Sequence, residues 1–362
     1  MLKKLLLTTT VMAIATGAMA AEEKILNVYN WSDYIAEDTI ANFEKRTGIK
    51  VNYDVFDSNE VLEAKLISGS SGYDIVVPSA PFLERQIQAG VFRKLDRSKL
   101  SNHGNLDKQI LDRMSAHDPK NEHAVPYMWG TTGFGYNINK VKEASPDAPV
   151  GSWSMILDPE VAAKFSDCGI TLLDAPTEVF GTVMAYLGRD PLSNDKKDVE
   201  LFTEHMLKIR PFIKYFHSSQ NINDLANGEI CVAMGWSGDM LLARDRAAEA
   251  GQGIEINYVI PKEGAVMWFD NLAIPADAPH QDNAHLFINY MMEPEVIAAV
   301  TNYVFYANGN SAAMAHVLDD VKSDPAIYPS ETVKANLFPD LADSNKFTRA
   351  LTRAWTKIKT GK

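Results

Sequence analysis

The sequence predicts an α/β protein built from two lobes. Strand-like and helix-like segments alternate from residue 25 onward, which is typical of a sheet flanked by helices. The chain has 362 residues, which is long for a single compact core. Hydrophobic residues make up 46% of it, so it can bury a substantial apolar surface. We therefore expect mainly parallel sheets flanked by helices in each lobe.

The first twenty residues have the features of an export signal. Lys3 and Lys4 form a positive start, residues 5–18 are mostly apolar, and Ala18-Met19-Ala20 matches a cleavage site. The apolar run is too short to span a bilayer as a stable helix, and no later stretch is long enough. We expect residues 1–20 to be removed and the exported chain not to insert into a membrane.

A β-α-β-α-β run predicts the first lobe. Predicted strands at 25–29, 51–55 and 74–78 alternate with predicted helices at 38–47, 60–67 and 82–89. Ligands bind to such sheets beyond the carboxyl ends of the strands. The residues that directly follow these strands are therefore candidate site residues.

A second lobe is predicted from the middle of the chain. Segments 125–127 and 133–137 are predicted to leave the first lobe as strands, and segments 254–260 and 268–274 are predicted to return to it. Between them lie predicted helices near 158–165, 178–187, 198–209 and 222–226, and a buried strand at 230–234. These segments divide the chain into lobe 1 (21–134 and 256–306) and lobe 2 (135–255 and 307–362).

The net charge argues against a nucleic-acid partner. It is −12 for the whole chain and −14 once Lys3 and Lys4 are removed, whereas nucleic-acid binding needs basic patches. An acidic balance mildly favours cationic ligands, although acidity also serves solubility alone.

The two cysteines, Cys168 and Cys231, predict a disulfide, because an even pair in an exported protein usually pairs. Two buried thiols remain the alternative. Neither a CxxC motif nor a nearby histidine cluster supports a metal site.

Three clusters combine aromatic residues with a carboxylate after predicted strands. They are Trp31-Ser32-Asp33-Tyr34, Trp236-Ser237-Gly238-Asp239 and Trp268-Phe269-Asp270. A carboxylate holds an organic cation through charge-assisted hydrogen bonds, and aromatic faces cover its alkyl chain and add cation–π attraction. One such cluster commonly serves only packing and capping, but three in one chain favour a binding site for a cation.

Enzyme motifs are weak throughout the sequence. The segment 235–239 fails the nucleophile-elbow pattern because its fifth residue is Asp239. The histidines have no HExxH spacing, and segment 130–135 does not match the dinucleotide fingerprint. We therefore expect no cofactor, no metal and no enzymatic activity. A secreted hydrolase that uses Asp239 and Asp270 is the alternative.

Five long stretches resemble the periplasmic polyamine-binding proteins of ABC importers. The stretches are Val28–Tyr34, Asp74–Ser79, Tyr215–Gln220, Cys231–Asp239 and Glu263–Asp270. The resemblance implies a two-lobed, type II-like clamshell with two crossover hinge segments, and a disulfide that joins Cys168 to Cys231. It also implies a periplasmic monomer that delivers a polyamine to inner-membrane permease subunits.

The resemblance further implies the ligand-binding residues and a ligand preference. At Trp268 the putrescine-preferring members carry Phe, so the resemblance favours spermidine over putrescine. Pro81 departs from the small polar residue of the family pattern. Another cationic solute, such as agmatine, stays open. The implied ligand-binding residues are Trp31, Ser32, Asp33, Tyr34, Ser79, Glu178, Trp236, Asp239, Trp268, Asp270 and Tyr306.

Overall fold

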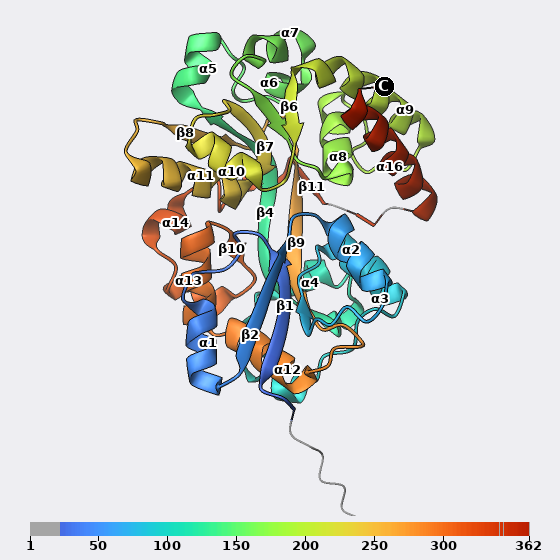
Figure 1. The fold of residues 1–362 in the computed structure, drawn as a ribbon, viewed down its shortest axis with the longest axis vertical. Helices are drawn as coiled ribbons and strands as arrows, with labels where there is room; N and C mark the ends of the chain where they lie inside the picture. The colour runs from blue at the N-terminus through green and yellow to red at the C-terminus, as the bar shows by residue number, and fades with distance from the viewer. Residues whose placement is uncertain (1–21, 340, 343, 362) are drawn as a thin grey trace, which may run out of the picture.

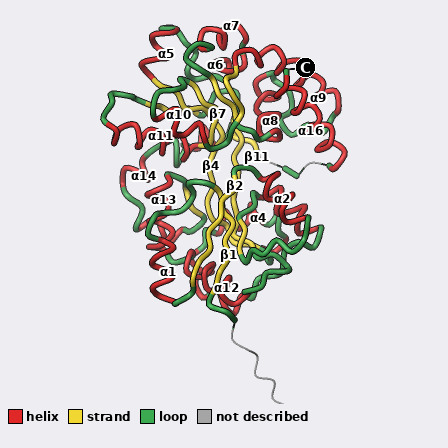
Figure 2. Tube along the Cα trace, viewed as in Figure 1, coloured by secondary structure: helices red, strands yellow, loops and turns green. Residues whose placement is uncertain are grey.

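The chain folds into two lobes joined by long strands (Figure 1). The computed structural model describes residues 22–339, 341–342 and 344–361, so the predicted signal at 1–20 lies outside the described residues. Figure 2 shows the strands as a band through the middle of both lobes, with the helices outside. The predicted α/β class and the two lobes are confirmed.

One run of paired strands connects the two lobes. The order is β2-β1-β3-β9-β4-β7-β5-β6, while β8 and β10 pair with β4 and β11 pairs with β9. The strands are β1 (Ile25–Trp31), β2 (Lys50–Phe56), β3 (Ile75–Val76), β4 (Ala124–Asn137), β5 (Ile170–Leu172), β6 (Ile213–Phe216), β7 (Val232–Trp236), β8 (Ile256–Val259), β9 (Ala265–Ala273), β10 (Ala307–Asn308) and β11 (Leu337–Pro339).

The sheet is mixed, whereas the sequence predicted mainly parallel pairing. The β-α-β units do pair in parallel, as β1 does with β2 and β3, and β5 with β6 and β7. The antiparallel pairs of the described strands all involve β4 or β9. Because β4 runs from the first lobe into the second and β9 runs back, these two strands must pair in opposite directions.

The strand β4 belongs to both lobes. Its first half pairs with β9 and β10, and its second half, Thr132–Asn137, pairs with β7 and β8. This pairing groups β8 with the second lobe and β10 with the first, whereas the sequence placed 256–306 in lobe 1 and 307–362 in lobe 2. The lobe boundaries therefore remain a proposal. The pairing of β8 and β10 differs from the division of the chain that the sequence predicted.

Helices cover the strands on both sides of the view in Figure 1. Their ends follow local signals: Gly48 ends α1 in the left-handed conformation, and the Ser58 hydroxyl caps α2. None of the helices in the described part of the chain has the length and apolar character that a membrane span requires. The α-helices are α1 (Thr39–Thr47), α2 (Asn59–Ile67), α3 (Ala80–Gln88), α4 (Lys108–Met114), α5 (Ile138–Ala144), α6 (Ser154–Leu157), α7 (Pro159–Ala162), α8 (Pro176–Tyr186), α9 (Lys196–Ile209), α10 (Gln220–Ala226), α11 (Ser237–Ala250), α12 (Gln281–Met291), α13 (Pro294–Val304), α14 (Asp319–Ser323), α15 (Glu331–Lys334) and α16 (Asn345–Thr360).

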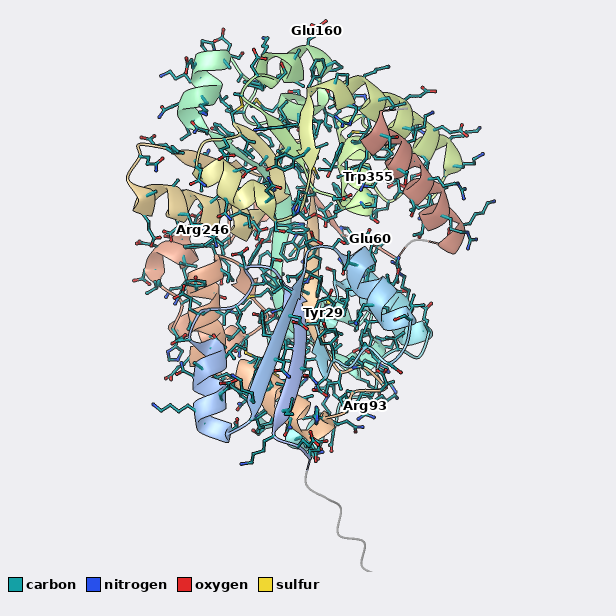
Figure 3. All side chains as sticks on the ribbon, in the orientation of Figure 1. Tyr29, Glu60, Arg93, Glu160, Arg246 and Trp355 are labelled. Carbon is teal, nitrogen blue, oxygen red and sulfur yellow. A yellow bond between two sulfur atoms is a disulfide. The ribbon has the colours of Figure 1, made fainter. Side chains whose placement is uncertain are left out.

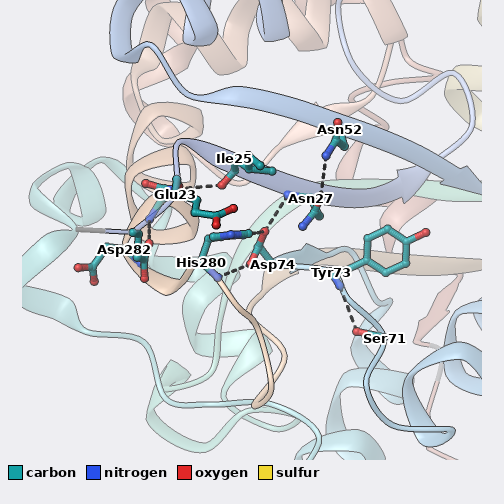
Figure 4. Close-up of polar contacts among 11 residues, drawn as sticks. Glu23, Ile25, Asn27, Asn52, Ser71, Tyr73, Asp74, His280 and Asp282 are labelled. Atoms are coloured by element: carbon teal, nitrogen blue, oxygen red, sulfur yellow. Dashed lines mark hydrogen bonds and ion pairs between the residues drawn. The ribbon is translucent and has the colours of Figure 1, made fainter. Parts of the chain in front are cut away.

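A buried carboxylate fixes the register of the first lobe's strands (Figure 4). Asp74, just before β3, accepts hydrogen bonds from the backbone N–H of Asn27 at 2.8 Å and of His280 at 2.6 Å. The His280 ring Nδ1 lies 3.0 Å from the same carboxylate. These contacts hold β1 and β3 side by side, and the carboxyl ends of these strands carry Trp31 and Ser79.

The path of β4 between the lobes requires a residue without a side chain. A Cβ atom at Gly133 would lie 2.2 Å from the carbonyl oxygen of Val259 on β8. Only glycine permits this close approach of two backbones. Gly133 therefore lets β4 and β8 pair where the chain passes from one lobe to the other.

The predicted disulfide between Cys168 and Cys231 is confirmed, with the two Cα atoms 5.5 Å apart. Cys168 lies in the turn before β5, and Cys231 directly precedes β7. Since β5 and β7 are neighbours in the sheet, the bridge joins the starts of two paired strands of the second lobe.

Replacing both cysteines with serine is expected to lower the free energy of unfolding by about 4 kcal/mol on the chain-entropy account of a long loop. The physical reason is that the bridge joins residues 63 positions apart, so its removal raises the conformational entropy of the unfolded chain. Urea unfolding of both proteins measures the loss. A reductant should destabilise the wild type and leave the Cys168→Ser/Cys231→Ser variant unchanged. Equal stability of the two oxidised proteins would contradict the prediction.

Candidate ligand-binding site

A cavity of about 430 Å³ lies between the two lobes, and we refer to it as the ligand cavity. Every residue that the sequence assigned to the site lines it, except Asp33. The lining residues are Trp31, Ser32, Tyr34, Phe56, Asp57, Ser79, Glu178, Ser218, Ser219, Trp236, Asp239, Trp268, Asp270 and Tyr306.

Asp270 on β9 is held by two residues of the first lobe. The Ser79 hydroxyl donates a hydrogen bond to its Oδ1 at 2.5 Å, and the Tyr34 hydroxyl donates to its Oδ2 at 2.9 Å. Ser79 is itself fixed by a hydrogen bond from Asn59. Burial raises the pKa of Asp270 to about 7, although both hydrogen bonds act to lower it. This carboxyl is therefore oriented but lacks a compensating positive charge.

Asp239 has a similar environment at the start of α11. The Tyr306 hydroxyl donates to its Oδ1 at 2.7 Å and accepts from its backbone N–H at 3.1 Å. This contact requires Gly238, because a Cβ there would lie 2.4 Å from the Tyr306 ring. Burial raises the pKa of Asp239 to about 7. A second oriented carboxyl thus lies in the cavity without a cation.

Glu178, in the first turn of α8, is the third acid of the cavity and is half-buried. Its carboxylate accepts a hydrogen bond from the Thr132 hydroxyl at 2.6 Å and from the Trp236 indole N–H at 2.9 Å. Burial raises the pKa of Glu178 above its ordinary value, and the two hydrogen bonds oppose the rise. Because Thr132 lies on β4, the strand that crosses between the lobes also positions this acid.

Aromatic rings from both lobes form the walls of the ligand cavity. Trp31 of the first lobe meets Trp236 of the second edge to face, with ring centroids 5.3 Å apart. Tyr306 contacts both Tyr34 and Trp268, at 5.1 Å and 5.3 Å. The Trp31 indole is fixed by a hydrogen bond to the backbone, so its face is held rigidly toward the cavity.

Asp33 is the one predicted ligand-binding residue that lies apart. It is exposed, and its backbone adopts the left-handed conformation, with φ at 52°. Its carboxylate accepts a hydrogen bond from Arg246 at 2.6 Å. Arg246 belongs to α11 of the second lobe, and Figure 3 labels it at the level where the lobes meet. Asp33 therefore links the two lobes at the margin of the site.

Four lining residues were missed in the sequence: Phe56, Asp57, Ser218 and Ser219. Phe56 ends β2 and lies opposite Trp31 in the pairing of β1 with β2. Ser218 and Ser219 follow the end of β6, a strand that was not predicted from the sequence. The rule that ligands bind beyond strand ends would have found Phe56 and Asp57, which follow the predicted strand 51–55.

The arrangement suits an organic cation. The lining carries acids and aromatic rings but, among the residues that the structure describes, no lysine, arginine or histidine. No group of three or more histidine, cysteine, aspartate or glutamate residues in the described ranges is arranged to hold a metal ion. The cavity thus offers negative charge and apolar faces together.

Comparison with known proteins defines the class. Residues 38–329 match the family described as bacterial extracellular solute-binding protein. The chain is 56% identical to the putrescine-binding periplasmic protein PotF of Escherichia coli strain K12, over 97% of this chain and 95% of that protein. It is 53% identical to the putrescine-binding periplasmic protein SpuD of Pseudomonas aeruginosa strain UCBPP-PA14, over 99% and 98%.

A solved structure agrees with this assignment. The putative spermidine/putrescine ABC transporter from Listeria monocytogenes superposes with a TM-score of 0.84 at 32% identity, over 94% of this chain and all of that one. The chain therefore belongs to the bacterial extracellular solute-binding proteins. Since these proteins bind a solute without transforming it, the alternative of a hydrolase is excluded, and the predicted export to the periplasm is confirmed.

The free energy of unfolding of the ligand-free protein is expected to fall as the pH rises from about 4 to about 7. Asp239 and Asp270 have folded-state pKa values of about 7, well above those of the unfolded chain. The folded state therefore keeps protons that the unfolded state releases, and this stabilisation is lost as the pH rises through the folded pKa. The contribution is at most about 1.4 kcal/mol per pH unit for each carboxyl.

Urea unfolding at several pH values tests this dependence. The Asp270→Asn variant should lose stability less steeply than the wild type over the same window, because one of the carboxyls with a raised pKa is gone. An identical slope would show that Asp270 does not titrate in the folded protein as described.

Proposed function

We propose that this protein captures a protonated polyamine in the periplasm and delivers it, as a monomer, to an ABC importer. The observation that carries the proposal is the ligand cavity itself. It contains two buried carboxyls, Asp239 and Asp270, and the half-buried Glu178 between aromatic rings, with no basic side chain among its described lining residues.

The chemistry of ligand and cavity is complementary. Amines titrate near pH 10, so a polyamine carries a positive charge on each nitrogen at neutral pH. A buried ammonium requires a carboxylate, and a buried carboxyl with a raised pKa is stabilised in its charged form by a cation. The methylene groups between the ammonium groups can pack against Trp31, Trp236 and Trp268.

The contacts are sufficient for tight binding. Hydrogen bonds to charged groups contribute about 1.5–3 kcal/mol each, and a desolvated cation–π contact up to about 2 kcal/mol. After the costs of association and lobe closure, about −8 kcal/mol or better remains, which is a micromolar or tighter dissociation constant.

The relatives support the ligand class. Their names specify putrescine, putrescine with agmatine or cadaverine, and spermidine with putrescine. Several of the similar solved structures are named as ABC transporter components, which supports the proposed permease partner. Agmatine is also a cationic amine, so it belongs in any test panel.

Within this class we propose spermidine as the preferred ligand over putrescine. Trp268 presents an indole, the strongest cation–π partner, to the ligand cavity. A triamine has an internal ammonium that can lie over this ring, whereas a diamine carries charge only at its ends. The names of the two most identical relatives above favour putrescine instead, so the comparison of these two ligands is decisive.

Asp239→Asn and Asp270→Asn are each expected to weaken polyamine binding by about 2–5 kcal/mol, because each leaves a buried ammonium without its carboxylate. Calorimetry with spermidine and putrescine measures the loss. Asp245→Asn is the matched control, since Asp245 is exposed on the same helix as Asp239. Wild-type affinity in both site variants would contradict the proposed function.

Trp268→Phe is expected to shift the ratio of spermidine to putrescine affinity toward putrescine, because a phenyl ring offers a weaker face to the internal ammonium. Competition calorimetry on both proteins measures the ratio. A wild type that prefers putrescine, or a ratio unaffected by the substitution, would refute the proposed preference and leave the ligand class intact.

A further inference from the structure

A second, smaller cavity adjoins the ligand cavity. Trp31, Glu178 and Trp236 line both cavities, so the two share a wall. Glu60 of α2 and Phe82 of α3 line the second cavity but not the ligand cavity. We refer to the second cavity as the side chamber. It therefore extends the binding region from Glu178 toward the first lobe.

Glu60 makes no ion pair with another residue that the structure describes, although the charge of Arg85 acts to lower its pKa. Burial raises the pKa of Glu60 to about 7, and the neighbouring charge of Glu178 raises it further. Figure 3 labels Glu60 on α2 at the level where the lobes meet. A ligand that enters between the lobes can thus reach it.

Arg85, whose charge acts on Glu60, is already paired with Glu63. Arg85 donates from Nε and Nη2 to the two carboxylate oxygens of Glu63, at 2.5 Å and 2.6 Å. Its guanidinium group also lies over the Phe82 ring, 3.8 Å from the centroid. This bidentate pair directs the charge of Arg85 to Glu63 and leaves the Glu60 carboxylate open to a ligand.

We propose that Glu60 is a specificity-determining residue whose carboxylate holds the third ammonium group of a triamine. The diamine part of that ligand lies in the ligand cavity, beside Asp239 and Asp270, and its remaining arm passes Glu178 into the side chamber. Trp31 and Phe82 cover the methylene groups of this arm. A diamine bound in the ligand cavity leaves Glu60 without a partner. This inference rests on the proposed function. It assigns the part of the site that distinguishes a triamine from a diamine.

Calorimetry on the mature protein tests the assignment with the Glu60→Gln variant. We expect the dissociation constant for spermidine to rise about tenfold or more, and that for putrescine to stay within about twofold. Glu249→Gln is the matched control, since Glu249 is exposed on α11. Thermal unfolding of each variant checks the fold, and Glu60→Asp, which keeps the charge, should recover part of the spermidine affinity.

The two monoacetylated isomers of spermidine provide a double-mutant cycle. Acetylation of the nitrogen that faces Glu60 should weaken binding to the wild type but cause little further loss in Glu60→Gln. If Glu60→Gln weakened the affinity for spermidine and putrescine equally, or changed neither, the proposed role of Glu60 would be wrong. Polyamine binding by the wild type would still uphold the proposed function. A wild type that binds no polyamine would overturn both.

Discussion

The structure depends on burying carboxyl groups between two lobes without a protein cation to neutralise them. Asp239 and Asp270 each receive a tyrosine hydroxyl, and their pKa values still rise to about 7 because burial outweighs these hydrogen bonds. An empty closed site is therefore electrostatically costly. The proposed polyamine would remove that cost at several carboxyls at once, and ligand binding and lobe closure would then favour each other.

The strand β4, which passes between the lobes, also contacts an acid of the ligand cavity. Thr132 on β4 donates its hydroxyl to Glu178, and the adjacent Thr131 pairs with the hydroxyl of Tyr258 on β8. Gly133 follows directly and permits the close approach of β4 to β8. Three consecutive residues thus serve an acid of the site, a contact with the returning strand and the passage between lobes.

The local signals in the sequence predicted most of the fold and the candidate site. The β-α-β alternation, the glycine at the end of α1 and the aromatic–acid clusters are all short-range patterns. The cluster Trp268-Phe269-Asp270, expected after a strand, lies within β9 instead. The antiparallel pairing of β4 with β9 was missed, because it depends on the direction in which distant strands return through the sheet. The orientation of Asp33 was also missed, since its partner Arg246 lies more than two hundred residues away on the other lobe.

The sequence by itself predicted the α/β class with two lobes, the disulfide and the aromatic–acid clusters, because these follow from alternating segments, an even cysteine pair and short motifs. The class of protein and the full set of site residues were implied by the resemblance to a known family. Only the tertiary structure decided which carboxyls share one cavity, which tyrosine orients each of them, and that Glu60 adjoins Glu178 while Arg85 is engaged by Glu63. The physical reason is that burial and charge compensation are set by contacts between distant segments. A carboxyl at the end of a strand has the same local sequence whether its neighbour in space is a cation, a hydroxyl or an empty chamber.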